Sequence, residues 1–208
     1  MADIWVYAEV KDKALRHVTF EMTSAARALA DAAECDVVAV VCETGVEGLQ
    51  ELAAYGADRI VVVPDALDPY ATQAAVDSLA DLAREHEPAV VMFSHSSFGM
   101  DAAPCMAQAL GAVYVPEIVA VDAARRAVVR EAYSGKVLET VAVAQDGVPT
   151  ILTVRPKAIE AAAVREGAST PEISWTPSGS HAVRQVVKDV VRKVSGRVDL
   201  TEADRVVA

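Results

Sequence analysis

The sequence is poor in aromatic residues and in positive charge. Aromatic side chains make up only 5% of the 208 residues, although hydrophobic residues make up 53%. Because most of the apolar side chains are Ala and Val, the composition is typical of helices packed closely on a buried, Val-rich parallel sheet. The formal net charge of −11 repels phosphate backbones, and we therefore expect no nucleic-acid partner.

Long apolar runs and cysteine pairs are also missing. No apolar run approaches the roughly 20 residues of a membrane-spanning helix, so we expect no membrane insertion. The chain opens with Met1-Ala2-Asp3 and lacks the basic start of a secretion signal, which predicts a cytoplasmic location. Cys35, Cys42 and Cys105 form no C-x-x-C motif, and we interpret them as reduced structural thiols.

Apolar runs and helical periodicity alternate along the first half of the chain. Strands are predicted over residues 4–8, 37–41, 59–63 and 89–93, and helices over 18–33, 46–55, 70–85 and 101–110. Four successive strand–helix units predict a parallel sheet with helices on both faces, because right-handed crossovers leave few other arrangements.

The pattern becomes β-rich after Gly111. Strands are predicted over 113–121, 127–133, 136–144 and 150–154, separated by turn residues that predict antiparallel additions to the sheet. An irregular crossing segment follows from Pro171. Valines recur at helical intervals over 181–194, but so many β-branched residues favour a strand, and both interpretations stay open.

The glycine motifs that bind nucleotide phosphates are absent. Neither G-x-G-x-x-G nor G-x-x-x-x-G-K-[ST] occurs, and Glu9 follows the first strand where a glycine-rich loop would stand. Open α/β sheets bind ligands at the carboxyl ends of their strands. The candidate pocket is therefore the stretch after the fourth strand, formed by Ser94, His95, Ser96, Ser97 and Gly99.

Two interpretations of that stretch remain. His95, flanked by hydroxyl groups, could act as a general base or bind an anion. Alternatively, the serine side chains simply cap the following helix. His17, His86 and His181 have no second ligand at helical spacing, so we expect no metal site, and no catalytic constellation appears around Ser134 or elsewhere.

Arg155 and Pro156 form a second candidate site. An arginine at a strand end, beside a rigid proline, can present its planar guanidinium to a carboxylate or phosphate. The pair is interpreted either as a contact with a partner or another domain, or as a local ion pair.

Short motifs in a shared order resemble the N-terminal domain of the electron transfer flavoprotein alpha subunit. They are Trp5-Val6-Tyr7-Ala8-Glu9, Leu15-Arg16-His17-Val18-Thr19, Ser24-Ala25-Ala26-Arg27, Ala54-Tyr55-Gly56-Ala57-Asp58, Val91-Met92-Phe93, Gly99-x-Asp101-x-x-Pro104, Tyr133-Ser134-Gly135-Lys136, Thr153-Val154-Arg155-Pro156 and Asp199-Leu200-Thr201-Glu202-Ala203-Asp204. The resemblance implies a Rossmann-like, three-layer α/β sandwich of the adenine nucleotide alpha hydrolase-like type.

The resemblance also implies an electron carrier component rather than an enzyme. It predicts a scaffold over residues 1–194 that pairs with a beta subunit, and a linker with a first-strand remnant of a FAD-binding domain over 195–208. FAD is expected in the complete protein, where electrons arrive from flavoprotein dehydrogenases such as acyl-CoA dehydrogenases, but no cofactor is expected on this chain alone. The alternative is a stand-alone module that binds an adenine nucleotide near residues 94–99.

Overall fold

The computed structural model describes residues 2–63, 72–143, 147–165, 167–176, 188–189 and 191. In chain order the elements are β1 (Ile4–Tyr7), β2 (Val10–Lys11), β3 (Ala14–Leu15), α1 (His17–Ala33), β4 (Val37–Val41), α2 (Glu51–Ala54), β5 (Arg59–Val62), α3 (Thr72–His86), β6 (Val90–Ser94), α4 (Ser97–Leu110), β7 (Val113–Asp122), a 3-10 turn (Ala123–Arg125), β8 (Ala127–Ala132), β9 (Val137–Ala142), β10 (Thr150–Val154) and β11 (Glu172–Ser174).

Nine strands form one mixed sheet in the order β11-β5-β4-β1-β6-β10-β7-β8-β9. The pairs from β11 to β7 are all parallel, whereas β7, β8 and β9 pair antiparallel. The chain leaves β1 toward β4 on one side and later returns to β6 on the other. The strand order therefore reverses beside β1, and such a reversal is where open α/β sheets place their ligand crevice.

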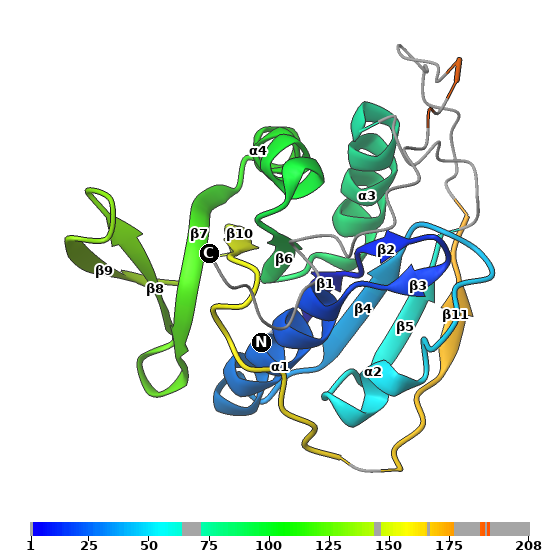
Figure 1. The fold of residues 1–208 in the computed structure, drawn as a ribbon, viewed down its shortest axis with the longest axis horizontal. Coiled ribbons are helices and arrows are strands. Elements are labelled where there is room, and N and C mark those ends of the chain that lie inside the picture. The colour runs from blue at the N-terminus through cyan, green and yellow to red at the C-terminus, as the bar shows by residue number, and fades with distance from the viewer. Residues whose placement is uncertain are drawn as a thin grey trace.

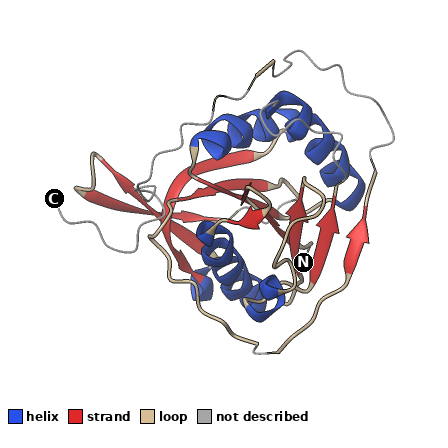
Figure 2. Ribbon diagram, turned by 45° about the vertical axis from the view of Figure 1, so that its right-hand side comes forward, coloured by secondary structure: helices blue, strands red, loops and turns tan. Residues whose placement is uncertain are grey.

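The central strands are buried on both faces. Every residue of β4, β6 and β10 is buried, and the side chains of each strand alternate between two helical layers. Val38 and Val40 face the apolar cluster of α3 and α4, whereas Ala39 and Val41 face the cluster that includes Leu52 of α2. Figure 2 shows the resulting three layers, with helices above and below the sheet. The continuous Val runs are thus explained by burial on both sides.

Strands β8 and β9 form a hairpin that projects away from the body of the domain (Figure 1). All six of their cross-strand pairs are in register, from Ala127 opposite Ala142 to Ala132 opposite Val137. Strand β9 is the edge of the sheet, and five of its six residues are exposed. The hairpin is held to the domain by the pairing of β8 with β7 and by Val128, which is buried in the core cluster that includes Ile4 and Met22.

A long extended segment, which we call the strap (residues 155–171), carries the chain from β10 to the opposite edge of the sheet. It runs along the outside of α1 and α2 and ends in β11, which pairs with β5 (Figure 1). Ser24 of α1 exchanges two 3.1 Å hydrogen bonds with the backbone of Ala162. The amides of Val164 and Arg165 both donate to the Ala54 carbonyl. The strap is thus fastened at several points, although its described residues, 155–165 and 167–171, form no helix or strand.

The α/β class, the parallel sheet and the antiparallel additions predicted from the sequence are confirmed. The helix predicted over 46–55 is wrong, because only Glu51–Ala54 is helical. Gly45 and Gly48 adopt positive φ angles of 66° and 73°, and Glu47 donates its amide to Lys13 instead of to a helical partner. The helix predicted from residue 101 begins earlier, at Ser97.

Two short elements were not predicted. Strands β2 and β3 form a small hairpin between the first predicted strand and the first predicted helix, and β11 lies within the segment expected to be irregular. The undecided segment 181–194 lies outside the described residues except for 188, 189 and 191, which belong to no helix or strand. The predicted linker over 195–208 also lies outside them.

Candidate functional site

The carboxyl ends of β1 and β6, where the strand order reverses, hold a carboxylate of the chain itself. Ser94, the last residue of β6, donates its hydroxyl hydrogen bond to Glu9, which follows β1. The other carboxylate oxygen of Glu9 lies 2.5 Å from a guanidinium nitrogen of Arg16. Ser94 is 2% exposed, and the side chains of Glu9 and Arg16 are 13% and 20% exposed. A charged, hydrogen-bonded group thus occupies the position expected for a ligand.

The backbone of Glu9 is fixed as firmly as its side chain. Its amide donates to the Thr19 hydroxyl at 3.0 Å, and its carbonyl accepts from that hydroxyl at 3.2 Å. The Arg16 amide donates to the same carbonyl at 2.9 Å. Thr19 is fully buried in the first turn of α1, so helix packing sets the position of the carboxylate.

His95 lies at the neighbouring strand end and bonds to the sheet. Its Nδ1 is 2.9 Å from the Thr153 hydroxyl, which also accepts a 2.8 Å hydrogen bond from the Glu117 amide. The His95 amide donates to the Val154 carbonyl at 2.7 Å. These contacts connect β6, β10 and β7 at their carboxyl ends, and they give His95 a partner in the protein.

Ser96, Ser97 and Gly99 belong to the start of helix α4. Ser96 is the N-cap, and its hydroxyl accepts a 3.2 Å hydrogen bond from the Gly99 amide. Ser97 is exposed in the first turn of the helix. A Cβ atom on Gly99 would lie 1.8 Å from the Ser94 carbonyl oxygen, so glycine is required for this close approach. The helix-capping interpretation therefore accounts for Ser96.

Arg155 also lies at the carboxyl ends of the strands, because Val154 of β10 is in register with Ser94 of β6. Its Nε is 3.1 Å from Glu117, and its terminal nitrogen is 3.0 Å from Glu131. The hydrogen bond that Arg155 donates to Glu131, together with the one that it donates to Glu117, raises the pKa of Arg155 despite the opposing effect of desolvation. The structure thus gives Arg155 local ion pairs and leaves a third of its side chain exposed.

Glu117 reaches Arg155 because of a bulge in β7. The register between β7 and β10 shifts there, and Glu117 has a positive φ of 57°, which is unusual for a residue other than glycine. The Thr153 hydroxyl holds the Glu117 amide in this conformation. No sequence signal pointed to Glu117 as the partner of Arg155.

Pro156 lines a groove of about 550 Å³ between the start of α1 and the strap. Glu21, only 2% exposed, lies in the groove wall. Its carboxylate accepts a 2.7 Å hydrogen bond from the Lys157 amide, and it lies 2.9 Å from His17 Nδ1. This buried carboxylate therefore anchors the first residues of the strap to α1.

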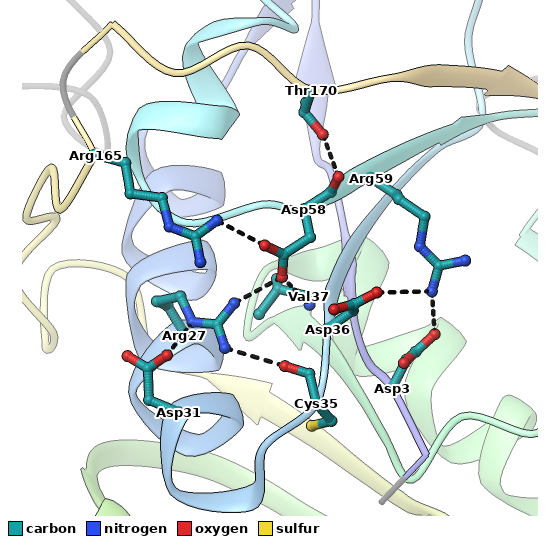
Figure 3. A network of polar contacts seen from close by, with 10 residues as sticks. All are labelled: Asp3, Arg27, Asp31, Cys35, Asp36, Val37, Asp58, Arg59, Arg165 and Thr170. Carbon is teal, nitrogen blue, oxygen red and sulfur yellow. Dashed lines mark hydrogen bonds and ion pairs between the residues drawn. The ribbon is translucent and has the colours of Figure 1, made fainter.

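A second polar cluster lies at the amino ends of the parallel strands (Figure 3). The sequence did not predict it. Arg27 of α1 is only 6% exposed and lies 2.6 Å from Asp58, which precedes β5. Asp58 also accepts a 2.8 Å hydrogen bond from the Val37 amide, and its second oxygen lies 2.6 Å from Arg165 of the strap. Thr170 donates to the Asp58 carbonyl.

Two opposing effects determine the pKa of Asp58. Burial would raise it, but hydrogen bonds from Arg165 and Val37 and the charges of Arg27 and Arg165 outweigh burial and lower the pKa. Gly56 allows the contact, because a Cβ atom there would lie 2.7 Å from the Arg27 side chain. The available sequence signal was an arginine in an otherwise apolar helix face, together with the Gly56-Ala57-Asp58 turn.

Among the residues that the structure describes, no three His, Cys, Asp or Glu side chains come together as a metal site. No described helix is both long and apolar enough to cross a membrane.

The fold and the crevice define a Rossmann-like α/β domain whose phosphate-binding loop is replaced by a carboxylate and its partners. The family model described as electron transfer flavoprotein domain matches residues 4–179. The chain belongs to the electron transfer flavoprotein domain family.

Curated relatives agree with the family match. The chain is 37% identical to "Electron transfer flavoprotein subunit alpha" of Syntrophomonas wolfei, over all of this chain and 65% of the relative. It is 31% identical to the Bacillus subtilis protein of that name, over 98% of the chain and 62% of the relative. It is 26% identical to "Protein FixB" of Clostridium saccharobutylicum, over 99% and 63%. The chain thus spans just under two thirds of the length of these relatives.

Proposed function

We propose that the chain is the N-terminal portion of an electron transfer flavoprotein alpha subunit in the cytoplasm. The observation that supports this proposal is the coverage of the relatives named subunit alpha. They match 98–100% of this chain, and this chain covers 62–65% of their length. In this role the chain is a scaffold that pairs with a beta subunit, and the complete protein carries electrons from acyl-CoA or similar dehydrogenases through FAD. The chain then supplies no catalytic residue, because the redox chemistry belongs to the flavin.

The proposed scaffold covers residues 1–194. Residues 195–208 would form the linker and the first strand of a FAD-binding domain, and they lie outside the described residues. The described part of the chain supports placing the flavin outside this scaffold, since Glu9 rather than a glycine-rich loop follows β1. We therefore assign no flavin-binding residue to this chain and place FAD on the part of the longer relatives that it does not span.

A flavin titration tests this assignment. The purified chain is mixed with excess FAD and desalted, and its visible flavin spectrum is recorded. We expect no retained flavin, whereas stoichiometric retention would contradict the assignment and make residues 94–99 the first place to mutate. Binding of AMP or ATP in a parallel calorimetric titration would favour the alternative, a stand-alone nucleotide-binding module.

The β8–β9 hairpin is the surface that we propose for the beta subunit. Tyr133 at its tip is 78% exposed, and Leu138 and Val137 on the edge strand are 66% and 45% exposed. Exposed apolar side chains beside an unpaired strand edge are typical of an interaction surface. Arg155 and Pro156 lie at the carboxyl edge of the sheet, and the exposed part of Arg155 is proposed as a further contact with the partner or the flavin domain.

Complex formation tests the surface. The chain is co-expressed with the electron transfer flavoprotein beta subunit of the same genome, and the mass of the product is measured by light scattering. We expect a one-to-one complex that Leu138→Glu weakens at least about tenfold. Val164→Glu is the matched control, because Val164 is an exposed apolar residue of the strap, away from the hairpin. Equal binding by both variants would rule out the hairpin as the contact surface.

A further inference from the structure

The Glu9 carboxylate has the same kinds of hydrogen-bond and ion-pair partners as an anion bound by a protein. One carboxylate oxygen accepts the Ser94 hydroxyl hydrogen bond, and the other faces the Arg16 guanidinium. Hydroxyl and guanidinium groups are the donors with which proteins bind phosphate oxygens. The crevice beside β1 is, in addition, the place where an open α/β sheet receives its ligand.

We propose that Glu9 is the built-in occupant of an anion site formed by Ser94 and Arg16, and that it excludes phosphate-bearing ligands from the crevice. The proposal goes beyond the scaffold function, because it assigns a latent binding site and explains why the site is closed. The ligand class is an inorganic phosphate or the phosphate of a nucleotide.

Burial and rigidity make this occupation effective. Ser94 is 2% exposed, so its hydroxyl has little access to water, and Glu9 supplies its acceptor. The two hydrogen bonds with Thr19 and the bond from the Arg16 amide hold the Glu9 backbone in place. An incoming phosphate would meet a fixed negative charge among side chains that are 20% exposed or less, where like charges repel strongly.

Removing the carboxylate should therefore reveal the site. In Glu9→Ala the hydroxyl of Ser94 loses its acceptor, and Arg16 loses its 2.5 Å carboxylate partner. A buried donor left without an acceptor favours any anion that fits. Glu9→Gln keeps the size of the side chain but removes the charge, so it should give a smaller gain.

The test is calorimetric titration of the chain with inorganic phosphate and, separately, with AMP. We expect saturable phosphate binding by Glu9→Ala, and no saturation of the unmodified chain at phosphate concentrations about ten- to hundredfold higher, because the charge-assisted hydrogen bonds are available only without the Glu9 carboxylate. Adding Ser94→Ala to Glu9→Ala should abolish the gain. Glu47→Ala, which removes an exposed carboxylate after β4, is the matched control and should bind no phosphate.

Two results would overturn the proposal. One is saturable binding of phosphate or AMP by the unmodified chain that Ser94→Ala removes, because the crevice would then be open. The other is no gain in Glu9→Gln or Glu9→Ala, with circular dichroism showing a folded chain. Should Glu9→Ala not fold, Glu9→Gln alone decides the second point. Flavin retention and beta-subunit binding are measured separately, so the scaffold function and this proposal can fail independently.

Discussion

The Arg27 guanidinium and the Asp58 carboxylate form an ion pair of 2.6 Å between helix α1 and the start of β5, at the amino ends of the parallel strands. Both residues belong to motifs through which the sequence resembles the flavoprotein family. Their contact joins α1, β4 and the strap, since Asp58 also bonds to Val37 and Arg165. These motif residues are therefore explained by folding and not by cofactor binding.

Asp58→Asn should destabilise the domain in a pH-dependent manner. Arg27 is nearly buried and would lose its main counter-ion, which we expect to lower the free energy of unfolding by about 2–3 kcal/mol at pH 7. Because folding lowers the pKa of Asp58 from its ordinary 3.8, its stabilisation is complete above about pH 4 and is lost as the pH falls further.

Urea unfolding of both proteins from pH 7 to pH 3 measures this effect. The difference between them should shrink below about pH 4. Asp31→Asn is the matched control, because Asp31 pairs with the same Arg27 but is 67% exposed, and it should change stability by less than about 1 kcal/mol. A pH-independent difference for Asp58→Asn would show that the charge of Asp58 is not responsible.

Arg165→Gln should loosen the strap without unfolding the core. Arg165 is 42% exposed, so its pair with Asp58 contributes no more than about 1 kcal/mol to global stability. We expect faster hydrogen exchange in residues 167–174 and unchanged exchange in β4 and β6, because the strap opens locally. Arg84→Gln removes a comparable exposed pair within α3 and should leave the strap unaffected. Unchanged exchange in the strap would mean that its other contacts suffice.

Gly99→Ala should destabilise the domain strongly. The added Cβ would lie 1.8 Å from the Ser94 carbonyl oxygen, and a backbone atom cannot move aside without shifting β6 or α4. We expect a loss of at least about 3 kcal/mol in the free energy of unfolding, measured by urea denaturation. Gly111→Ala is a useful comparison, because space around Gly111 is open and only its positive φ opposes the substitution. Similar losses for both would argue against the close approach.

Cys42 and Cys105 should differ in reactivity. Burial raises the pKa of Cys42 to about 12, whereas Cys105 is exposed on α4. At pH 8 only about one Cys42 thiol in ten thousand is ionised, and the thiolate is the reactive form. Iodoacetamide followed by mass spectrometry should label Cys105 first and leave Cys42 unmodified until the protein unfolds. Cys105→Ser should remove the fast phase, and rapid labelling of Cys42 in the folded chain would contradict the raised pKa of its thiol.

The regular elements were largely predictable, because their signals are local. Val37–Val41 and Thr150–Val154 are apolar runs bounded by turn residues, and both are observed as strands over these bounds. The helix expected over 46–55 failed because Gly45 and Gly48 take left-handed backbone angles that periodicity does not detect. Strand β11 was missed because its three exposed residues carry little apolar pattern, and only pairing with β5 makes them a strand.

The sequence predicted where the candidate residues lie in the sheet, but it did not predict which residues they bond to. Chain order and the strand-end rule selected Ser94, His95 and Arg155, but nothing local indicates that Glu9 reaches Ser94 across 85 residues or that Arg155 faces Glu117. Such contacts depend on which strands become neighbours and on a bulge in β7. The Arg27–Asp58 cluster was missed for the same reason.

The sequence by itself determined the α/β class, the alternation of strands and helices and the absence of a glycine-rich phosphate loop, because these depend on residue type and short-range spacing. Tertiary structure alone decided the order of the strands, the bonding of Glu9 to Ser94 and the path of the strap. These features depend on long-range pairing and packing. A buried charge or carbonyl requires a hydrogen-bonding partner, and that partner can lie far away in the sequence.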